Sequence, residues 1–462
     1  MLKKSKAGRE TQIKQLLAEK IARLAESLQA RSIKEETKVL RLEIPVSGAD
    51  PLFWLAAQRS PIKFYWADRE KHFETAAIGQ ADLVTSDGPA DYETLFERLD
   101  QKLSSADGDA RYYGGLRFNN YGGADKAWRA YGSYRFFLPR FELSLRDGKG
   151  FLACYLLTSG GRAVSPSTLL AELDALVFPP REEEAKMPRL ISRNDTPDRL
   201  TWGKNLDAAL GSLEGGAFEK IVLARKSSLE FDAKLDPLIL LRSLKRQTKD
   251  CFHFCFVPSL KTAFIGASPE RLYARDGVAL KTEALAGTRP RKSNREANER
   301  LAQELLRSEK DIREHRIVVD GIKEALSPLC QSLQVDRVRV LTLARSQHLL
   351  CAFQARLGDG TTDAQLLSRL HPTPAVGGYP TANALSEIER LESFDRGWYA
   401  GPIGWVGRDQ VEFAVAIRSG LIEGSRLHLF AGAGIVKGST AEGEWNEIEN
   451  KISDFIKVLA GS

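Results

Sequence analysis

The stretch AGAGIVKGSTAEGEWNEIENK, residues 431–451, passes from a strand through a polar turn into a helix. Gly432 and Gly434 alternate with alanine, so backbone N–H groups there can approach an anion closely. A dinucleotide-binding loop is disfavoured because Lys437 occupies the place of the third glycine in the GxGxxG pattern. A plain strand-to-turn passage is the alternative interpretation of these glycines.

Acidic residues occur in pairs on two predicted helices, over 295–326 and about 443–459. The pairs, spaced at i and i+3, are Asp311 with Glu314 and Glu444 with Glu447, and Lys451 lies one turn further. Each pair projects from one face of its helix. Together the pairs suit a hard cation such as Mg²⁺, with water completing its shell. A solvated charged face is the alternative, because acids at this spacing are common.

Three further charged residues stand out in the second half of the chain, outside the two predicted helices that carry the acidic pairs. Lys220 begins an apolar strand, KIVLAR, where desolvation would favour the neutral amine of a general base. Glu270 follows a strand and a tight turn in GASPERL, where a partly desolvated carboxyl group could act as an acid. Arg418 ends a strand and could bind a carboxylate in fork geometry. Ordinary surface residues are the alternative for all three.

The rest of the chain alternates strands with helices. Residues 38–180 show two-residue alternation with Gly, Asp and Pro turns, which predicts a large antiparallel sheet. The polar segment 178–198 reads as a connection between two halves. Further helices are predicted over 198–214 and 236–247. The strands that we predict are 39–44, 62–66, 134–138, 151–156, 220–225, 251–257, 263–266, 412–417 and 427–430.

The composition is that of an ordinary globular protein of 462 residues, with 43% hydrophobic and 28% charged residues and no apolar stretch long enough to span a membrane. Five cysteines without a CxxC pattern argue against a disulfide framework or structural zinc and favour a reducing cytoplasm.

The net charge of +6 arises within residues 1–34, which hold nine basic and three acidic residues. The remaining chain is neutral overall, which argues against a nucleic-acid partner. Apolar residues at helical spacing over 11–32 predict an amphipathic helix packed on the body, with membrane contact as the less favoured alternative.

Taken in order, eight blocks resemble the chorismate-utilising enzymes. These blocks are KIVLAR (220–225), GASPERL (266–272), EALAGTRPR (283–291), SEKDIREH (308–315), HPTPAVGGYP (371–380), FDRGWYAGPIGW (394–405), VAIRSG (415–420) and the stretch 431–451. The sequences of 371–380 and 394–405 are most similar to those of the isochorismate synthase branch in its menaquinone-pathway form. The resemblance covers about 196–458, whereas residues 1–195 match weakly.

The resemblance implies a role for each matching residue. Lys220 matches a base that activates water, and Glu270 matches the acid on the other side of the substrate ring. The residues that match the Mg²⁺ site are Glu314 and Glu447 as principal ligands, with Asp311 and Glu444 nearby or water-bridged. The residues that match the substrate-binding groups are Gly287, Thr288, His348, Arg418, Gly432, Gly434 and Lys451.

The resemblance also implies the reaction, a Mg²⁺-dependent isomerisation of chorismate to isochorismate by water attack at C2 and loss of the C4 hydroxyl. Ala286 occupies the place of the nucleophilic lysine of aminodeoxychorismate synthase, and Lys220 argues against anthranilate synthase, so no glutamine amidotransferase subunit is expected. Salicylate synthase, which goes on to eliminate pyruvate, shares Lys220 and Glu270 and stays the alternative.

The fold that the resemblance implies is α+β: one large unit of two face-packed antiparallel sheets flanked by helices, as in anthranilate synthase component I. Within that unit we expect a basic N-terminal helix over 1–34, a variable N-terminal part over 35–195 and a chorismate-binding region over 196–458.

Overall fold

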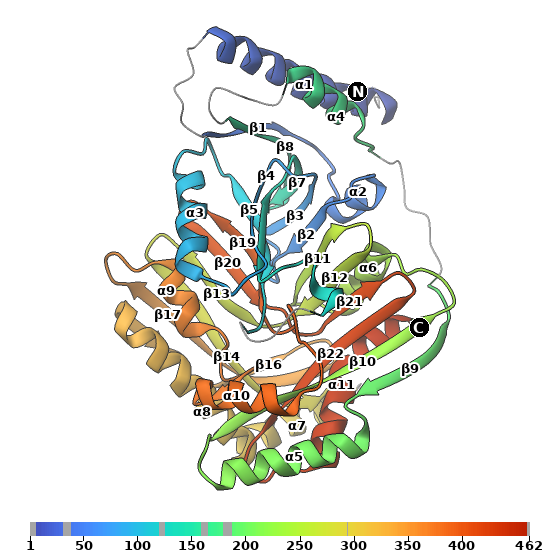
Figure 1. The fold of residues 1–462 in the computed structure, drawn as a ribbon. Coiled ribbons are helices and arrows are strands. Elements are labelled where there is room, and N and C mark those ends of the chain that lie inside the picture. The colour runs from blue at the N-terminus through green and yellow to red at the C-terminus, as the bar shows by residue number, and fades with distance from the viewer. Residues whose placement is uncertain are drawn as a thin grey trace.

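The computed structural model describes residues 6–30, 38–119, 125–158, 165–178, 187–292 and 294–459. Two large antiparallel sheets pack face to face, and most helices cover their outer faces and one end (Figure 1). The helices are α1 (Lys6–Ala30), α2 (Pro51–Ala57), α3 (Tyr92–Ser104), α4 (Pro166–Asp174), α5 (Arg199–Glu214), α6 (Pro237–Gln247), α7 (Arg295–Arg307), α8 (Glu309–Leu326), α9 (Asp363–Leu370), α10 (Thr381–Leu391) and α11 (Ala441–Leu459), with short 3₁₀ turns η1 (Lys126–Trp128) and η2 (Ser327–Leu329).

The first sheet has 12 strands in the order β1-β8-β7-β3-β2-β11-β12-β21-β22-β10-β18, with β9 also paired to β10. Its strands are β1 (Lys38–Pro45), β2 (Lys63–Ala67), β3 (Phe73–Ile78), β7 (Phe141–Arg146), β8 (Lys149–Thr158), β9 (Leu190–Thr196), β10 (Lys220–Phe231), β11 (Phe252–Ser259), β12 (Thr262–Ser268), β18 (Gly378–Tyr379), β21 (Ser419–Glu423) and β22 (Arg426–Ile435).

The second sheet has 10 strands in the order β15-β17-β14-β13-β20-β19-β5-β6-β4, with β16 paired to β17. Its strands are β4 (Asp82–Ser86), β5 (Arg111–Leu116), β6 (Tyr134–Leu138), β13 (Arg271–Asp276), β14 (Ala279–Pro290), β15 (Cys330–Val335), β16 (Arg339–Thr342), β17 (Ser346–Leu357), β19 (Pro402–Gly407) and β20 (Gln410–Val415).

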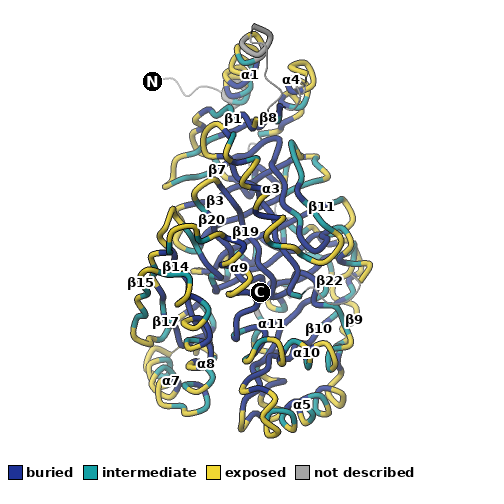
Figure 2. The backbone as a smooth tube through the Cα atoms, turned by 60° about the vertical axis from the view of Figure 1, so that its left-hand side comes forward, coloured by how far each residue is buried: buried dark blue, intermediate teal, exposed yellow. Residues whose placement is uncertain are grey.

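Both sheets combine strands from the two ends of the chain. In the first sheet β2 pairs with β11, and in the second β5 pairs with β19. Aromatic side chains fill the space between the sheets: the rings of Phe64 and Tyr113 lie 5.2 Å apart, and those of Phe137 and Phe256 stack at 5.7 Å. Figure 2 shows most strands buried, whereas β9, β15 and the outer sides of the helices are exposed or half-buried. The core is therefore shared by both ends of the chain, and the predicted α+β architecture of two packed antiparallel sheets is confirmed.

Four of the predicted elements differ in the structure, and one is the strand predicted over 412–417, which ends at Val415 so that Arg418 lies in the bend between β20 and β21. The single helix over 295–326 is wrong: Ser308 adopts an extended conformation between α7 and α8, and its hydroxyl accepts a hydrogen bond from the backbone N–H of Asp311. The segment 178–198 contains β9, while its residues 179–186 lie outside the described part of the chain. The strand predicted over 427–430 continues to Ile435, so Gly432 and Gly434 lie within β22.

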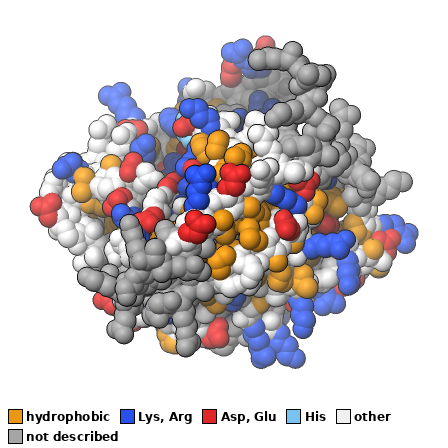
Figure 3. Space-filling model, turned by 90° about the horizontal axis from the view of Figure 1, so that it is seen from above, with side chains coloured by type: hydrophobic (Ala, Val, Ile, Leu, Met, Phe, Trp, Pro, Cys, Tyr) orange, Lys and Arg blue, Asp and Glu red, His pale blue; other side chains and the backbone are white. Residues whose placement is uncertain are grey.

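The N-terminal helix α1 packs on α4 and β1 through the buried side chains of Ile13, Leu17 and Ile21. Leu16 belongs to the same predicted apolar stripe but is 42% exposed, and residues 31–32 of that predicted helix are not among the described residues. On the face at this end of the molecule, basic and acidic side chains are interspersed (Figure 3). Among the described helices, none is both long and apolar enough to cross a membrane.

The block 394–405 places its side chains in the centre of the core. Trp398 is fully buried, with its ring 5.3 Å from that of Tyr131. The buried guanidinium of Arg396 donates to the carbonyl oxygens of Val222 and Val376, at 2.7 and 3.0 Å. Gly397 has φ +54°, and a Cβ atom there would lie 2.1 Å from the ring of Trp128. This position therefore requires glycine for both its backbone and its space.

We expect Gly397→Ala to lower the free energy of unfolding by about 2–4 kcal/mol, because the substitution adds left-handed strain to overpacking. Urea denaturation of the purified protein measures the change. Gly216→Ala is the matched control, because Gly216 has φ +77° but nothing within 4 Å of the added carbon. The control should lose only about 1 kcal/mol from strain. Equal losses in the two variants would contradict the packing argument.

Candidate active site

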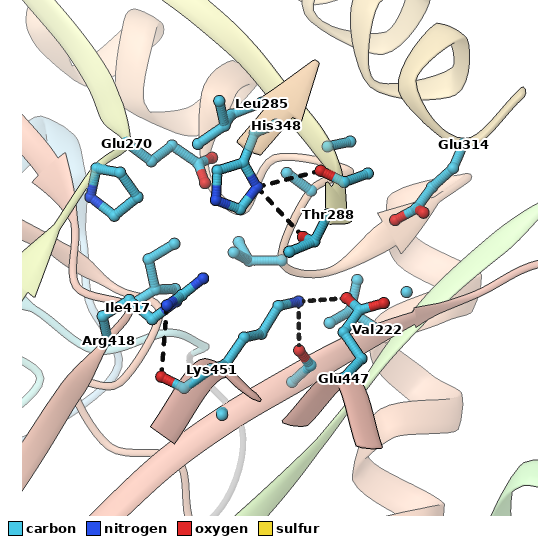
Figure 4. A pocket seen from close by; sticks show the side chains of 18 of the residues that line it. Val222, Glu270, Leu285, Thr288, Glu314, His348, Ile417, Arg418, Glu447 and Lys451 are labelled. Carbon is cyan, nitrogen blue, oxygen red and sulfur yellow. Dashed lines mark hydrogen bonds and ion pairs between the residues drawn. The ribbon is translucent and has the colours of Figure 1, made fainter. Parts of the chain in front are cut away.

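A pocket lies between the two sheets, at the end where α8 and α11 pack. Its wall combines β10 and β22 of the first sheet with β14 and β17 of the second. Of the residues predicted from the sequence, ten line this pocket: Glu270, Gly287, Thr288, Glu314, His348, Arg418, Gly432, Gly434, Glu447 and Lys451. Figure 4 shows most of these side chains converging from strands, loops and helices. Lys220, Asp311 and Glu444 are not part of the pocket wall.

Lys220 lies directly behind the wall. Its side chain is about 1% exposed, and its Nζ atom lies 3.0 Å from a carboxylate oxygen of Glu314. Apart from this ion pair, Nζ has no hydrogen-bond partner among the described residues. Two glycines allow the close packing around Lys220. A Cβ at Gly434 would lie 3.0 Å from the Cε of Lys220, and one at Gly378 would lie 2.4 Å from its carbonyl oxygen.

Glu270 occupies the connection between β12 and β13 and is 3% exposed. Its backbone is fixed, because its carbonyl oxygen accepts from the N–H of Val415 and its own N–H donates to the hydroxyl of Ser268. Burial, followed by the nearby Glu283 carboxylate, raises the pKa of Glu270 to about 8. Glu270 is therefore a protonated acid at neutral pH, on the side of the pocket away from Glu314 (Figure 4).

The four acidic residues predicted as metal ligands each contact a basic side chain. The pairs are Glu314 with Lys220 at 3.0 Å, Glu447 with Lys451 at 2.7 Å, Glu444 with Lys310 at 2.6 Å and Asp311 with Arg289 at 2.6 Å. Burial raises the pKa of Glu447, but the charge and hydrogen bond of Lys451, together with the charge of Lys310, outweigh burial and lower the pKa overall. These ion pairs balance the negative charge of a carboxylate cluster that would otherwise be costly to bury.

Two of the four predicted ligands, Glu314 and Glu447, are placed as a Mg²⁺ site would require. Within the described ranges, no three acidic, histidine or cysteine side chains converge on one metal position. Glu314 and Glu447 nevertheless both reach the pocket, from α8 and α11. Mg²⁺ commonly binds through one or two carboxylates, with water and an anionic substrate supplying the other oxygens. Two carboxylates facing a pocket for an anion match that requirement, and Asp311 and Glu444 lie outside the wall.

Groups that suit an anion face these carboxylates. Lys451 Nζ donates to the carbonyl oxygen of Gly432 at 2.9 Å as well as contacting Glu447. Arg418 adopts φ +50°, an uncommon conformation for a residue with a side chain, and its guanidinium donates to the carbonyl oxygen of Lys451. Strained backbone of this kind concentrates at functional sites. The pocket therefore holds two positive side chains next to its carboxylates.

His348 is a neutral member of the pocket wall. Burial, followed by the charges of Arg418 and Lys451, lowers the pKa of His348 to about 3. Its Nδ1 lies 3.1 Å from the carbonyl oxygen of Gly287, which only accepts hydrogen bonds, so the ring proton resides on Nδ1. Nε2 then accepts from the hydroxyl of Ser346 at 2.8 Å. These bonds hold the ring against the Gly287–Thr288 segment.

Sequence reasoning missed most of the apolar and aromatic part of the wall. The missed residues are Val222, Pro269, Leu285, Ala375, Val376, Tyr399, Ile417 and Ala431. Two of them, Ala375 and Val376, belong to the loop 371–380, whose end forms β18 and pairs with Lys220 and Ile221 of β10. The Pro and Gly content of this loop indicated rigidity, but nothing in its pattern indicated that it faces a pocket. Apolar residues carry no chemical signal that separates a pocket wall from a core.

A family model described as chorismate binding enzyme matches residues 24–460. The chain belongs to this family of chorismate-binding enzymes. The match begins well before residue 196, so it includes most of the N-terminal part that the ordered blocks left out.

Comparison with known relatives identifies the branch of the family that the chain resembles. The chloroplastic isochorismate synthase of Catharanthus roseus is 34% identical over 404 residues, covering 85% of this chain and 69% of the relative. The salicylate biosynthesis isochorismate synthase of Pseudomonas aeruginosa is 35% identical over 432 residues, covering 90% and 89%. The solved structure of Escherichia coli MenF, the menaquinone-specific isochorismate synthase, superposes with a TM-score of 0.81 at 29% identity, covering 95% and 98%. The chain falls among the isochorismate synthases of the family, which are isomerases.

We expect Gly434→Ala to displace the carboxylate of Glu314, because the added carbon would lie 2.2 Å from its oxygen and 3.0 Å from the Cε of Lys220. Affinity for Mg²⁺, measured by calorimetry on variant protein shown to be folded by circular dichroism, should fall roughly tenfold. Gly203→Ala in α5 is the control, because nothing lies within 4 Å of its added carbon. Unchanged Mg²⁺ affinity in the Gly434 variant would argue against Glu314 as a ligand.

Proposed function

We propose that this protein converts chorismate to isochorismate in a Mg²⁺-dependent reaction, with Lys220 as the general base and Glu270 as the general acid. The observation that carries the proposal is the pairing of a fully buried lysine behind one side of the pocket with a protonated glutamic acid on another. The isomerisation needs these two groups, because water must lose a proton at C2 while the departing C4 hydroxyl gains one.

In this mechanism Lys220 first releases the proton of its ion-paired ammonium group to solvent, and the neutral Nζ then accepts a proton from the attacking water as the water oxygen bonds to C2. The ring double bonds shift, the bond from C4 to oxygen breaks, and Glu270 donates its proton so that the hydroxyl leaves as water. Atoms therefore balance, with one water entering and one leaving. Proton exchange with solvent restores both groups for the next turnover. Each group contributes about 10²–10⁴-fold to the rate.

Binding of the dianionic substrate rests on a few placed charges. We assign Arg418 and Lys451 to its carboxylates, together with backbone N–H groups at Gly287, Thr288 and the Gly432–Gly434 segment. Glu314 and Glu447 would hold Mg²⁺, whose positive charge would neutralise and orient the ring carboxylate. Asp311 and Glu444, each paired with a basic side chain outside the wall, support the two ligands or reach the ion through water.

The alternatives within the family differ in what they need at the same pocket. Ala286 lines the wall where a covalent route would place a nucleophilic lysine, so this chain lacks that residue. We assign the enzyme to menaquinone biosynthesis, supported by the similarity to Escherichia coli MenF over 95% of the chain. The similarity to the Pseudomonas aeruginosa enzyme keeps salicylate formation as the second candidate. Chromatography of the products from chorismate and Mg²⁺ separates them: isochorismate alone supports the proposal, and salicylate with pyruvate supports the alternative.

We expect Lys220→Ala and Glu270→Gln each to reduce kcat by about 10²–10⁴-fold, because each variant lacks one of the two proton-transfer groups. Steady-state turnover of chorismate measures both, with circular dichroism to establish folding. Unmodified enzyme should lose activity as the pH rises through about 8, since Glu270 must be protonated to act. Substantial turnover by either folded variant would refute the corresponding assignment.

We expect Glu447→Gln to raise the Mg²⁺ concentration needed for half-maximal activity by roughly tenfold or more, because a neutral amide is a weaker ligand than a carboxylate. A Mg²⁺ titration of the initial rate at saturating chorismate measures this concentration. Glu449→Gln on the same helix is the control, because Glu449 pairs with Arg193 and Arg225 and does not line the pocket. A metal requirement equal to that of the control would count against the ligand role.

A further inference from the structure

The connection that carries Glu270 is held on both sides by one ion pair. Arg69 donates from Nη1 to the carbonyl oxygen of Pro269, the residue before Glu270, at 2.6 Å. Glu283 accepts from the backbone N–H of Arg271, the residue after Glu270, at 2.9 Å. Arg69 and Glu283 also contact each other through two parallel hydrogen bonds of 2.6 and 2.5 Å. The three contacts form a closed clamp around residues 269–271.

The two members of this clamp come from distant parts of the chain. Arg69 follows β2 of the first sheet, whereas Glu283 lies on β14 of the second, shortly before Leu285 and Ala286 of the pocket wall. The guanidinium of Arg69 lies over the ring of Phe252, at 5.3 Å from its centroid. The side chains of Arg69 and Glu283 are 14% and 5% exposed. The two parallel hydrogen bonds of a bidentate pair fix the relative orientation of its side chains. Because this pair is largely buried, loss of either partner would leave the charge of the other without compensation.

We propose that Arg69 and Glu283 are positioning residues, which fix the backbone on either side of Glu270 and place a negative charge behind its carboxyl group. The proposal rests on the role of Glu270 as the acid under Proposed function. Neither Arg69 nor Glu283 lines the pocket, so both act on the reaction through Glu270.

The charges around Glu270 give the clamp an electrostatic effect as well as a geometric one. The charged groups that act on it are Glu283 from β14, Lys220 from β10, Lys451 from α11 and Arg69, and Tyr399 is a further titratable neighbour. After burial, Glu283 is the largest influence that raises the pKa of Glu270, while the three cations lower it. Glu283 raises the pKa of Glu270 more than Arg69 lowers it, so the clamp as a whole favours the protonated form of Glu270.

The chain contains a matched pair for comparison. Arg275 on β13 binds Asp363 at the start of α9 with similar geometry, at 2.7 Å, and the two side chains are 14% and 6% exposed. Neither residue lines the pocket. Asp363→Asn therefore disrupts an ion pair of similar burial, between the second sheet and α9, without touching the connection at Glu270. A loss of activity that Asp363→Asn shares with variants of the Arg69–Glu283 pair therefore reports general destabilisation.

The deciding experiment measures kcat with chorismate and Mg²⁺ from pH 6 to 9 for Glu283→Gln, Glu283→Asp and Asp363→Asn. We expect Glu283→Gln to move the alkaline fall in kcat about one pH unit lower, because it removes the negative charge and leaves Arg69 uncompensated. Glu283→Asp keeps the charge and should keep the wild-type position of the fall. Asp363→Asn should retain both the position of the fall and most of the activity.

Arg69→Lys tests the geometric part, since it keeps the charge but loses the two-pronged contact. We expect it to lower kcat about tenfold with little change in KM and no shift of the pH profile. If Glu283→Gln fails to fold, the kcat of Arg69→Lys still tests the proposal.

An unshifted profile in folded Glu283→Gln, or equal kcat losses in Arg69→Lys and Asp363→Asn, would overturn the proposal. Wild-type activity in Glu270→Gln would instead overturn the role of Glu270 itself, so the two failures are distinguishable.

Discussion

The ion pair between Lys220 and Glu314 is the constraint on which the architecture of the pocket depends. A lysine with almost no solvent exposure is costly unless a carboxylate lies within reach, and here that carboxylate comes from α8, outside the strand that carries the lysine. The contact therefore requires α8 to approach β10 and β22, and Gly434 leaves the space for it. The other three acidic residues predicted as metal ligands follow the same arrangement, because each of them also has a basic partner.

This local pairing explains why bulk charge carries little information about the ligand. The excess of +6 lies within residues 1–34, and the helix there packs at the opposite end of the molecule from the pocket (Figure 1). The body is neutral, and attraction for a dianion has to come from single groups such as Arg418 and Lys451. Neighbouring carboxylates already neutralise part of that positive charge, as the ion pair between Lys451 and Glu447 illustrates. Additional positive charge from a metal ion is consistent with this balance.

The charged residues that meet at or directly behind the pocket were predictable from the sequence, whereas their surroundings were not. Lys220, Glu270 and Glu314 lie in short blocks whose residue types already restrict the chemistry. Val376 and Tyr399 line the same pocket, but apolar and aromatic residues look alike in a core and in a binding site. The break between α7 and α8 also escaped prediction, because Ser308 interrupts a helical pattern only through its cap and backbone conformation.

Under the proposed mechanism, the clamp at Glu270 gives the N-terminal part a role in the function even where its sequence carries no motif. Arg69 lies 214 positions from Glu283, and no local pattern links the two. Their contact depends on the pairing of β2 with β11, which places the end of an N-terminal strand beside Phe252. The N-terminal part thus completes the first sheet and thereby delivers a guanidinium to the backbone next to the acid. A sequence can vary widely around such a contact, since it needs only one arginine at the end of one correctly paired strand.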